Sequence, residues 1–195
     1  MTRVSSESAR PPGRPRSGLH AVVFAATLQT VHELGYARAT VDRIAAAAGV
    51  AKTTVYRRWP SKGALIIDCL LDAFGPVPLE GADRAEIMTG AIRWIAGKIA
   101  EPGVGDAFAG VFSDAVSDPE LRTLLSTRFQ DPYRIAVQDA LGESEQRVLF
   151  YIDVVVGTLL HRMGMTGAPM VESDVEALIE MTLRYFGTGD EGSGR

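Results

Sequence analysis

Residues 40–59 read TVDRIAAAAGVAKTTVYRRW, and this stretch decides the fold of the N-terminal part of the chain. Thr40 is a residue type that caps helix N-termini, and Asp42 suits the positive end of the helix that follows. Apolar side chains then recur at the spacing of a single helix face, at Val41, Ile44, Ala45 and Ala48. Gly49 permits a tight turn, and a second short helix is expected over roughly 52–59. Two short helices joined by a glycine turn are typical of a helix-turn-helix.

The second helix of this unit keeps polar side chains near its N-terminus, as a helix that enters the major groove must. Lys52 can reach a phosphate or a guanine, and threonine methyl and hydroxyl groups can contact thymine methyls or base edges. Phosphate contacts are expected from Tyr56, Arg57, Lys62 and the hydroxyl of Thr40, and a backbone or base contact from Arg43. The candidate DNA contacts of this region are therefore Thr40, Arg43, Lys52, Thr53, Thr54, Tyr56, Arg57 and Lys62. A bare pattern of this kind is weak evidence, because alanine-rich helix pairs are common in helical cores.

The charge of the chain is divided unevenly about this unit. Residues 1–62 hold ten Lys or Arg and three acidic residues, a net charge of +7, whereas residues 63–195 carry −11, for a total of −4. Such asymmetry indicates a polyanionic partner at one end of the chain. A solvated basic face would produce the same count.

Helical periodicity and helix-end signals extend over the remaining sequence, and no period-two strand pattern occurs. Helices are expected near 19–34, 61–74, 83–101, 105–116, 119–130, 132–141, 144–164 and 172–187. Asp118-Pro119 and Asp131-Pro132 each resemble an N-cap followed by proline at the first helical position. Gly75-Pro76-Val77-Pro78 is a linker-like break. The prediction is an all-α chain of about nine to ten helices, with an N-terminal three-helix helix-turn-helix domain and a C-terminal helical bundle.

The stretch from residue 18 to 74 resembles the DNA-binding domain of the TetR family of bacterial regulators. The matching features are Gly35-Tyr36, Thr40-Val41, Ile44-Ala45, Ala48-Gly49-Val50, Lys52, Tyr56, Trp59 and Pro60-Ser61-Lys62. Three positions depart from the family pattern: Ala51 stands where serine is usual, Trp59 where phenylalanine is commoner, and Gly63 where glutamate is commoner. The resemblance implies four segments: an arm at 1–17, expected to be disordered, the DNA-binding domain at 18–74, a ligand-binding and dimerisation domain at 79–188, and a disordered tail at 189–195.

The arm contains a second DNA-binding signal. Gly13-Arg14-Pro15-Arg16 resembles the core of an AT-hook, in which an extended Arg-Pro-Arg segment lies in a narrow A·T-rich minor groove. Arg14 and Arg16 are therefore candidate minor-groove contacts. A basic tail that only aids solubility is the alternative.

The resemblance also implies a homodimer and a small-molecule inducer site in the second domain. The candidate interface residues lie on the last two expected helices: Val155, Thr158, Leu159, Arg162, Leu178, Met181, Thr182 and Tyr185. A pocket for an apolar or amphipathic molecule would be lined by large residues: Trp94, Phe108, Phe112, Phe129, Tyr133, Tyr151 and His161. For each of these residues, an ordinary place in the core is the alternative.

Other classes of function find little support in the sequence. His20, His32 and His161 are scattered and Cys69 is alone, so we expect no metal site, no cofactor and no disulfide. The longest apolar run, residues 152–160, is short of the ~20 residues that span a bilayer. The expected function is that of a cytoplasmic repressor that binds a pseudo-palindromic operator as a homodimer and is released by a ligand. The rival hypotheses are an all-α interaction protein without DNA binding and a helical enzyme.

Overall fold

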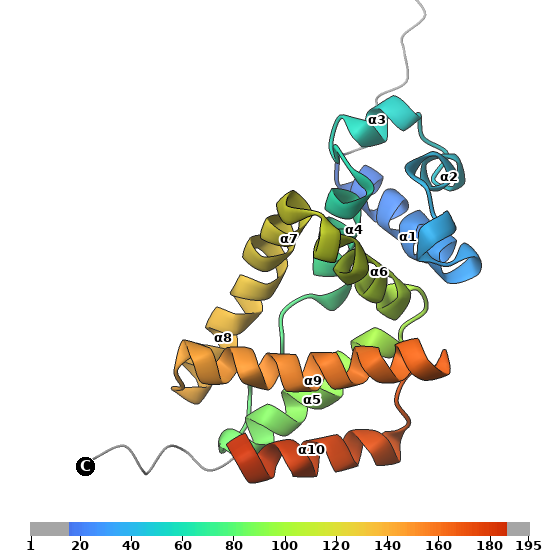
Figure 1. Ribbon diagram of the computed structural model, residues 1–195. Helices are drawn as coiled ribbons and strands as arrows, with labels where there is room; N and C mark the ends of the chain where they lie inside the picture. Colours follow the sequence, from blue (N-terminus) through green and yellow to red (C-terminus); the bar gives the residue numbers. More distant parts are fainter. Residues whose placement is uncertain (1–15, 187–195) are drawn as a thin grey trace, which may run out of the picture.

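The computed structural model describes residues 16–186, with side chains from residue 18, and this part of the chain is helical throughout and has no strand (Figure 1). Its helices are α1 (Arg16–Leu34), α2 (Val41–Ala47), α3 (Lys52–Tyr56), α4 (Lys62–Phe74), α5 (Arg84–Ala100), α6 (Val104–Ser117), α7 (Pro119–Leu125), α8 (Asp131–Leu141), α9 (Glu145–Thr166) and α10 (Glu172–Phe186). A 3-10 turn, η1 (Tyr36–Arg38), follows α1, and a π-helical turn, η2 (Ser126–Gln130), joins α7 to α8. The all-α prediction is confirmed.

The predicted arm and tail fall mainly on residues 1–15 and 187–195, which lie outside the described residues. The arm was predicted to extend to residue 17, but α1 already begins at Arg16. The short turn η1 was not predicted.

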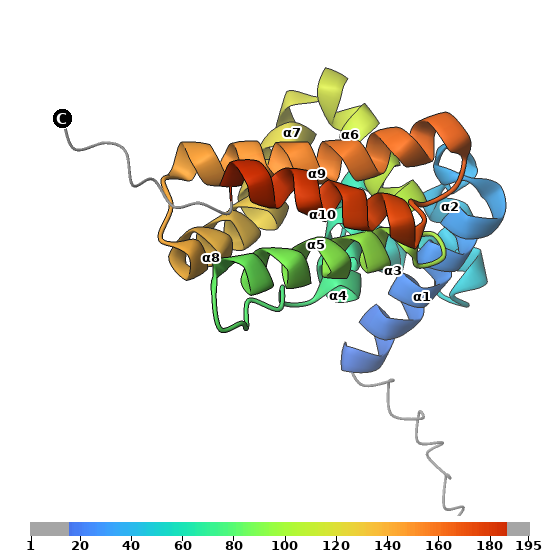
Figure 2. The same cartoon turned by 90° about the horizontal axis from the view of Figure 1, so that it is seen from below.

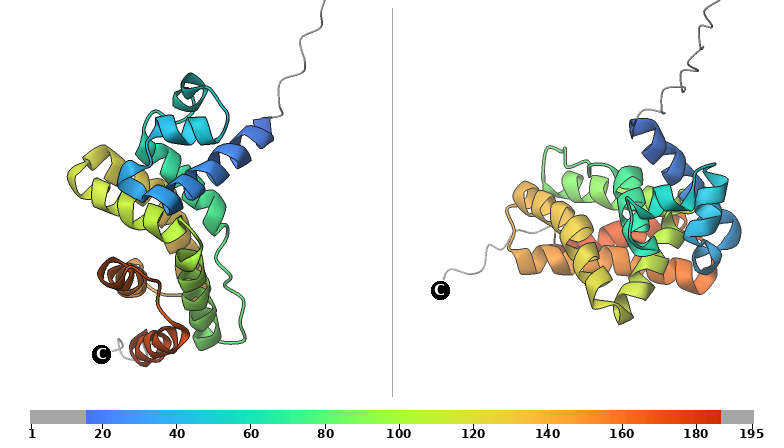
Figure 3. Two further views of the ribbon diagram at one scale, coloured as in Figure 1. Left: turned by 90° about the vertical axis from the view of Figure 1, so that its right-hand side faces the viewer. Right: turned by 90° about the horizontal axis from the view of Figure 1, so that it is seen from above.

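Two hydrophobic cores meet along α4. The smaller core joins α1 to α4 and includes Val23, Phe24, Ile44, Val55, Trp59, Leu65 and Cys69. The larger core joins α4 to the helices that follow and to Val31 of α1, and α4 contributes Ile66, Ile67, Leu70 and Phe74 to it. Figure 3 shows α1–α4 as a head at one end of the molecule, with α4 leading into the second domain. Because α4 is buried on both sides, it is shared by the head and the second domain.

Five of the ten described α-helices follow a residue whose side chain accepts a hydrogen bond from the first turn, and the sequence predicts this for Thr40, Ser61 and Asp118. Thr40 accepts from the Arg43 amide at 3.3 Å and Ser61 from the Ala64 amide at 3.1 Å. Asp118 accepts two bonds, each of 3.0 Å, from the amides of Glu120 and Leu121. These caps satisfy amide donors that have no partner inside the helix.

The predicted helix break at Asp131-Pro132 is wrong. Asp131 has helical dihedral angles (φ −58°, ψ −42°), so it does not take the extended conformation of an N-cap. The chain instead continues from α7 to α8 through the π-helical turn η2, directly before Pro132. Proline has no amide hydrogen to donate within a helix, and its ring collides with the carbonyl four residues earlier. The wider π-helical turn accommodates the missing hydrogen bond and the ring. Asp131 forms an ion pair with Arg134 at 3.3 Å.

The helices α9 and α10 lie side by side at the end of the molecule farthest from the head (Figures 1 and 2). Within residues 16–186, α9 is the one helix long and apolar enough to cross a membrane by length and composition, which the sequence analysis did not anticipate. It packs against α5, α6, α8 and α10, with Val148, Tyr151, Val155 and Leu159 in the core. One face of α9 is therefore packed against the protein, and 22% of its apolar window is buried.

Candidate DNA interface and ligand cavity

The geometry of α2 and α3 is that of a helix-turn-helix. Val41, Ile44 and Val55 are buried where the two helices meet α1 and α4. Gly49 has a φ of +64°, in the region that favours glycine, and the Val50 amide donates to the Ala45 carbonyl at 3.0 Å to close the turn. The predicted pattern of buried positions is therefore confirmed.

The outer surface of α3 lies at the tip of the head (Figure 1). The side chains of Lys52, Thr53, Tyr56 and Arg57 are exposed, and Thr54 is half-buried. The neighbouring candidates Thr40 and Arg43, from the start of α2, are exposed as well. The hydroxyl oxygen of Thr40 accepts the cap hydrogen bond, which leaves its proton for a phosphate oxygen.

Two of the predicted DNA contacts on this surface already have partners within the protein. The Lys52 ammonium lies 2.7 Å from the Asp42 carboxylate, and this hydrogen bond raises the pKa of Lys52. Both groups are exposed, so the pair is weak and a phosphate can replace Asp42. One guanidinium nitrogen of Arg43 donates to the Arg38 carbonyl at 3.1 Å.

Lys62 does not lie on the exposed DNA-facing surface in the way the sequence suggested. Its ammonium donates to the Tyr36 carbonyl at 2.8 Å and lies 3.5 Å from the centre of the Tyr36 ring. Burial lowers the pKa of Lys62. In this structure Lys62 therefore holds η1 against α4. No pattern near Lys62 predicted this contact, which spans 26 residues.

Of the two arginines predicted to contact the minor groove, only Arg16 belongs to the described residues. Arg14 lies outside the described residues, whereas Arg16 is the first residue of α1. An extended arm can therefore end no later than residue 15. The minor-groove contact stays a prediction for Arg14.

The departures from the TetR pattern have structural explanations. Ala51 has the extended conformation of an N-cap but makes no capping hydrogen bond, as its methyl side chain predicts. The indole nitrogen of Trp59 donates to the Asp68 carboxylate at 2.9 Å, which a phenylalanine could not do. A Cβ atom on Gly63 would lie 2.5 Å from the Leu121 side chain, so a larger residue there would require the Leu121 side chain of α7 to move.

One contact between the head and the second domain is made by Tyr36. Its hydroxyl donates to the Asp114 carboxylate of α6 at 2.6 Å, and its ring covers Gly110 so closely that a Cβ there would lie 2.0–2.4 Å from ring atoms. Burial and the hydrogen bond to Asp114 raise the pKa of Tyr36. Because Phe108 and Phe112 lie on the other side of the same helix, α6 connects this contact to the interior of the second domain.

A second contact between the head and the second domain passes through Asp68 of α4. One Asp68 oxygen accepts from Trp59, directly after α3, and the other lies 2.8 Å from the Arg128 guanidinium. Arg128 belongs to the π-helical turn η2, whose neighbouring residues Phe129 and Gln130 line a cavity. Two polar contacts, Trp59 to Asp68 and Asp68 to Arg128, thus join the segment after α3, the recognition helix, to the cavity wall.

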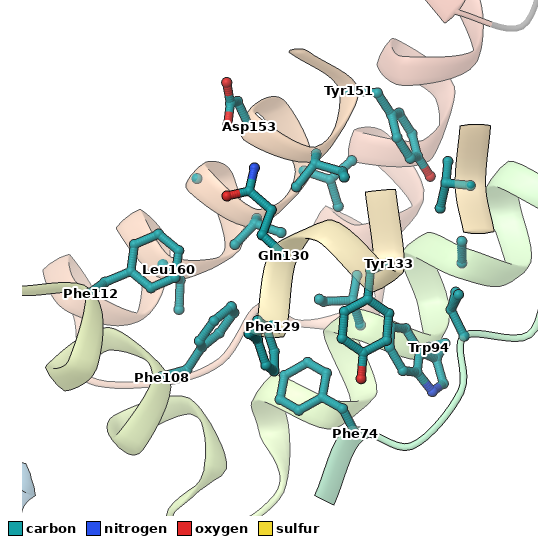
Figure 4. A pocket seen from close by; sticks show the side chains of 18 of the residues that line it. Phe74, Trp94, Phe108, Phe112, Phe129, Gln130, Tyr133, Tyr151, Asp153 and Leu160 are labelled. Atoms are coloured by element: carbon teal, nitrogen blue, oxygen red, sulfur yellow. The ribbon is translucent and has the colours of Figure 1, made fainter. Parts of the chain in front are cut away.

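The cavity has a volume of about 500 Å³ and lies between α4, α5, α6, η2, α8 and α9 (Figure 4). All seven residues predicted to line a pocket are among those that line it: Trp94, Phe108, Phe112, Phe129, Tyr133, Tyr151 and His161. Phe74, Gln130 and Asp153 line the cavity as well and were not predicted. Phe74 was assigned to the end of the DNA-binding domain, yet its ring packs against four other aromatic rings of the cavity wall.

The tyrosine hydroxyls of the cavity wall are directed to backbone carbonyls. Tyr133 donates to Gly75 at 2.8 Å, in the segment that connects α4 to α5, and Tyr151 donates to Met88 at 3.4 Å. Burial raises the pKa of Tyr133 to about 12 and also raises that of Tyr151, so both phenols are neutral at physiological pH.

Half of the predicted dimer-interface residues are not on the surface. Val155, Leu159, Leu178 and Thr182 are buried within the protomer, so their assignment to an interface is wrong. Thr158 and Arg162 are half-buried, and Arg162 pairs with Asp174 at 2.7 Å. Met181 and Tyr185 are exposed by 56% and 61%, together with Phe150 of α9, which was not predicted and is exposed by 51%. We call Phe150, Met181 and Tyr185 the exposed apolar patch; the rings of Phe150 and Tyr185 lie 6.1 Å apart.

Other reactive groups are few in the part of the chain that the structure describes. It contains no cluster of three or more His, Cys, Asp or Glu side chains that could hold a metal ion. Cys69 is buried, and its burial raises the pKa of the thiol to about 12, which keeps it in the unreactive protonated form.

The tight packing of Tyr36 on Gly110 leads to a prediction about stability. Gly110→Ala is expected to lower the free energy of unfolding by about 1–3 kcal/mol, because the new methyl group must displace the ring. In a Tyr36→Ala background the same substitution should cost nothing, since the obstructing ring is gone. Urea unfolding of the four variants measures this coupling.

The matched control for this prediction is Gly97→Ala on α5, where a Cβ meets nothing within 4 Å. There alanine is expected to be neutral or to stabilise the helix by up to about 1 kcal/mol. Equal stabilities for wild type and Gly110→Ala, or additive effects of the Tyr36 and Gly110 changes, would contradict the close packing.

Taken together, the exposed recognition helix and the separate helical domain with an aromatic cavity define a helix-turn-helix DNA-binding protein with a second domain. Residues 23–69 match the family described as "Bacterial regulatory proteins, tetR family". The HTH-type transcriptional regulator YdeS of Bacillus subtilis is 28% identical over 86% of this chain and 89% of its own length. The DNA-binding transcriptional repressor TetR of Mycobacteroides abscessus is 27% identical over 84% of this chain and 90% of its own.

A solved structure agrees with these sequence matches. The TetR transcriptional regulator from Rhodococcus sp. RHA1 has the same fold, with a TM-score of 0.62 and 19% identity over 87% of this chain and 97% of that one. Residues 23–69 therefore match the DNA-binding domain of the TetR family, and the chain is similar to HTH-type transcriptional regulators over most of its length.

Proposed function

We propose that this regulator is a homodimeric, cytoplasmic repressor, not an enzyme, that leaves its operator when a small aromatic molecule occupies the cavity. The observation that carries the proposal is the cavity of about 500 Å³, whose wall is joined to the recognition helix through Arg128, Asp68 and Trp59. The volume lies within the range of about 300–1,000 Å³ that is usual for small-molecule sites.

DNA recognition in this proposal depends on α3 and on the basic charge of the head. The N-terminus of α3 enters the major groove, with Lys52, Thr53 and Thr54 toward base edges. Tyr56 and Arg57 contact phosphates beside it. Two copies of α3 must reach half-sites about one helical turn apart, which requires a dimer and predicts an inverted repeat in the operator.

Release follows from a change in the cavity wall. A ligand that separates the rings of Phe108 and Phe129 displaces α6 and η2, and these elements hold Tyr36 and Asp68 respectively. Both contacts end on the head, so the displacement changes the spacing of the two recognition helices in the dimer. The ligand weakens DNA binding only to the extent that it binds the displaced conformation more tightly.

The experiment that tests this function begins with selection of an operator from a random double-stranded DNA library by the purified protein. An inverted repeat with half-sites about one helical turn apart is expected, with an affinity that falls steeply as salt rises. Uncharged aromatic compounds that raise the melting temperature are then added to the operator complex. They are expected to weaken operator binding by at least tenfold.

Two results would contradict the proposal. Selection that yields no preferred sequence argues against a specific regulator and favours an interaction protein. A compound that occupies the cavity, as shown by competition with other cavity ligands, and leaves the operator affinity unchanged argues against ligand-controlled release.

A further inference from the structure

We propose that the cavity is selective for planar aromatic cations over uncharged and anionic molecules of the same shape. This inference rests on the proposed function in that it concerns the same cavity, and it names the class of ligand. It combines three observations: the number of aromatic rings in the wall, the single carboxylate at the cavity, and the absence of lysine and arginine among the lining residues.

The wall of the cavity is dominated by aromatic side chains. Seven of the residues that line it carry aromatic rings with benzene or indole systems: Phe74, Trp94, Phe108, Phe112, Phe129, Tyr133 and Tyr151. Figure 4 shows these side chains converging from α4, α5, α6, η2, α8 and α9. Flat ligands can stack on such rings, and ring faces carry partial negative charge that attracts a cation.

The formal charge at the cavity is negative. Asp153 of α9 is the one carboxylate among the lining residues, and no lysine or arginine lines the cavity. Within the side chains described, from residue 18 to 186, no basic group forms an ion pair with Asp153, whereas Glu143 and Asp174 are paired with arginines. Asp153 is exposed and therefore remains available to a ligand cation.

The rest of the second domain reinforces this preference. Residues 63–186 contain nine basic and 19 acidic residues, so the second domain as a whole carries negative charge, which favours the approach of cations over anions. His161 carries the one imidazole among the lining residues, and binding of all ligands is measured at the same pH of 8.

The hydrogen-bond donors of the wall offer little to an anion. The hydroxyls of Tyr133 and Tyr151 are engaged with backbone carbonyls. The amide of Gln130 is one neutral donor group and cannot balance a buried negative charge. An anionic ligand would lose its hydration without gaining a cationic partner, which is strongly unfavourable.

The test uses three acridines that share one tricyclic skeleton: cationic 9-aminoacridine, uncharged 9-methylacridine and anionic acridine-9-carboxylate. Each is titrated into the full-length protein at pH 8, without DNA, by calorimetry. The cation is expected to bind at least about tenfold more tightly than the uncharged compound, and the anion at least about tenfold more weakly.

Substitution at the carboxylate makes the test specific. Asp153→Asn is expected to weaken binding of 9-aminoacridine by about tenfold and to change binding of 9-methylacridine by less than twofold. The matched control is Asp139→Asn, an exposed aspartate of α8 that does not line the cavity. The control should leave all three affinities unchanged.

The outcomes separate this inference from the proposed function. Equal binding of cation and uncharged compound, an insensitive Asp153→Asn variant, or no binding of any acridine overturns the cation preference, and release by other ligands is unaffected. Cation binding that depends on Asp153 supports the preference, whether or not operator affinity changes. An unchanged operator affinity would count only against ligand-controlled release. Because 9-aminoacridine intercalates into DNA, the Asp153→Asn protein at the same dye concentration is the reference in operator assays.

Discussion

Simultaneous replacement of Lys52 and Tyr56 by alanine is expected to lower operator affinity by about 100-fold or more. Both side chains are exposed on α3, and each is present twice in a dimer. A base contact contributes about 1–3 kcal/mol, and a phosphate contact contributes a salt-dependent part of the affinity. Fluorescence anisotropy with the selected operator, measured at several salt concentrations, would show the loss together with a shallower salt dependence.

The fold should survive this double substitution, because neither side chain belongs to the core of the head. Lys98→Ala is the matched control, since Lys98 also pairs with an acidic neighbour, Glu101 at 2.8 Å, but lies on α5 in the second domain. The control is expected to bind the operator like wild type. Undiminished binding by the double variant, or an equal loss in the control, would mean that α3 does not read the DNA.

The second large effect is expected from the exposed apolar patch. Met181→Glu combined with Tyr185→Glu should convert the dimer to a monomer, because four acidic side chains would face one another across a two-fold axis. Loss of the second head removes the effective-concentration advantage of a linked pair, so operator affinity should fall by about 100-fold. Light scattering coupled to gel filtration measures the mass, and anisotropy measures the affinity.

Val116→Glu is the matched control for the dimer. Val116 is the most exposed large apolar residue in the part of the chain with described side chains, at 78%, and lies near the C-terminal end of α6 rather than on α9 or α10. A glutamate there adds a negative charge outside the proposed interface and should leave the protein dimeric. A dimeric Met181/Tyr185 variant, or a monomeric control, would place the interface elsewhere.

The helix-turn-helix was predictable because its signals are local. Capping by Thr40, the turn at Gly49 and the buried stripe of α2 depend on residues within ten positions of one another. The same holds for the Asp118-Pro119 helix start. The aromatic cavity residues were found for a different reason: large rings on the middle helices of a two-domain regulator have few places other than the domain interior.

The predictions that failed concern elements with two plausible apolar faces or two plausible partners. On α9 and α10 half of the residues chosen for the dimer belong to the protomer's own core, because helical periodicity identifies an apolar face but not the surface it packs against. Asp131-Pro132 carries the same local signal as Asp118-Pro119, yet packing of α7 and α8 on the second core keeps the helix continuous.

The sequence by itself determined the helices, their caps, the recognition helix and the division of charge, because each depends on neighbours along the chain. Only the tertiary structure decided which cations are free and how the head is joined to the second domain. Tyr36 reaches Asp114 across 78 positions, Lys62 reaches back 26 positions to Tyr36, and Arg128 meets Asp68 from another helix. Such pairings depend on how helices cross in space, and helical periodicity carries no information about that.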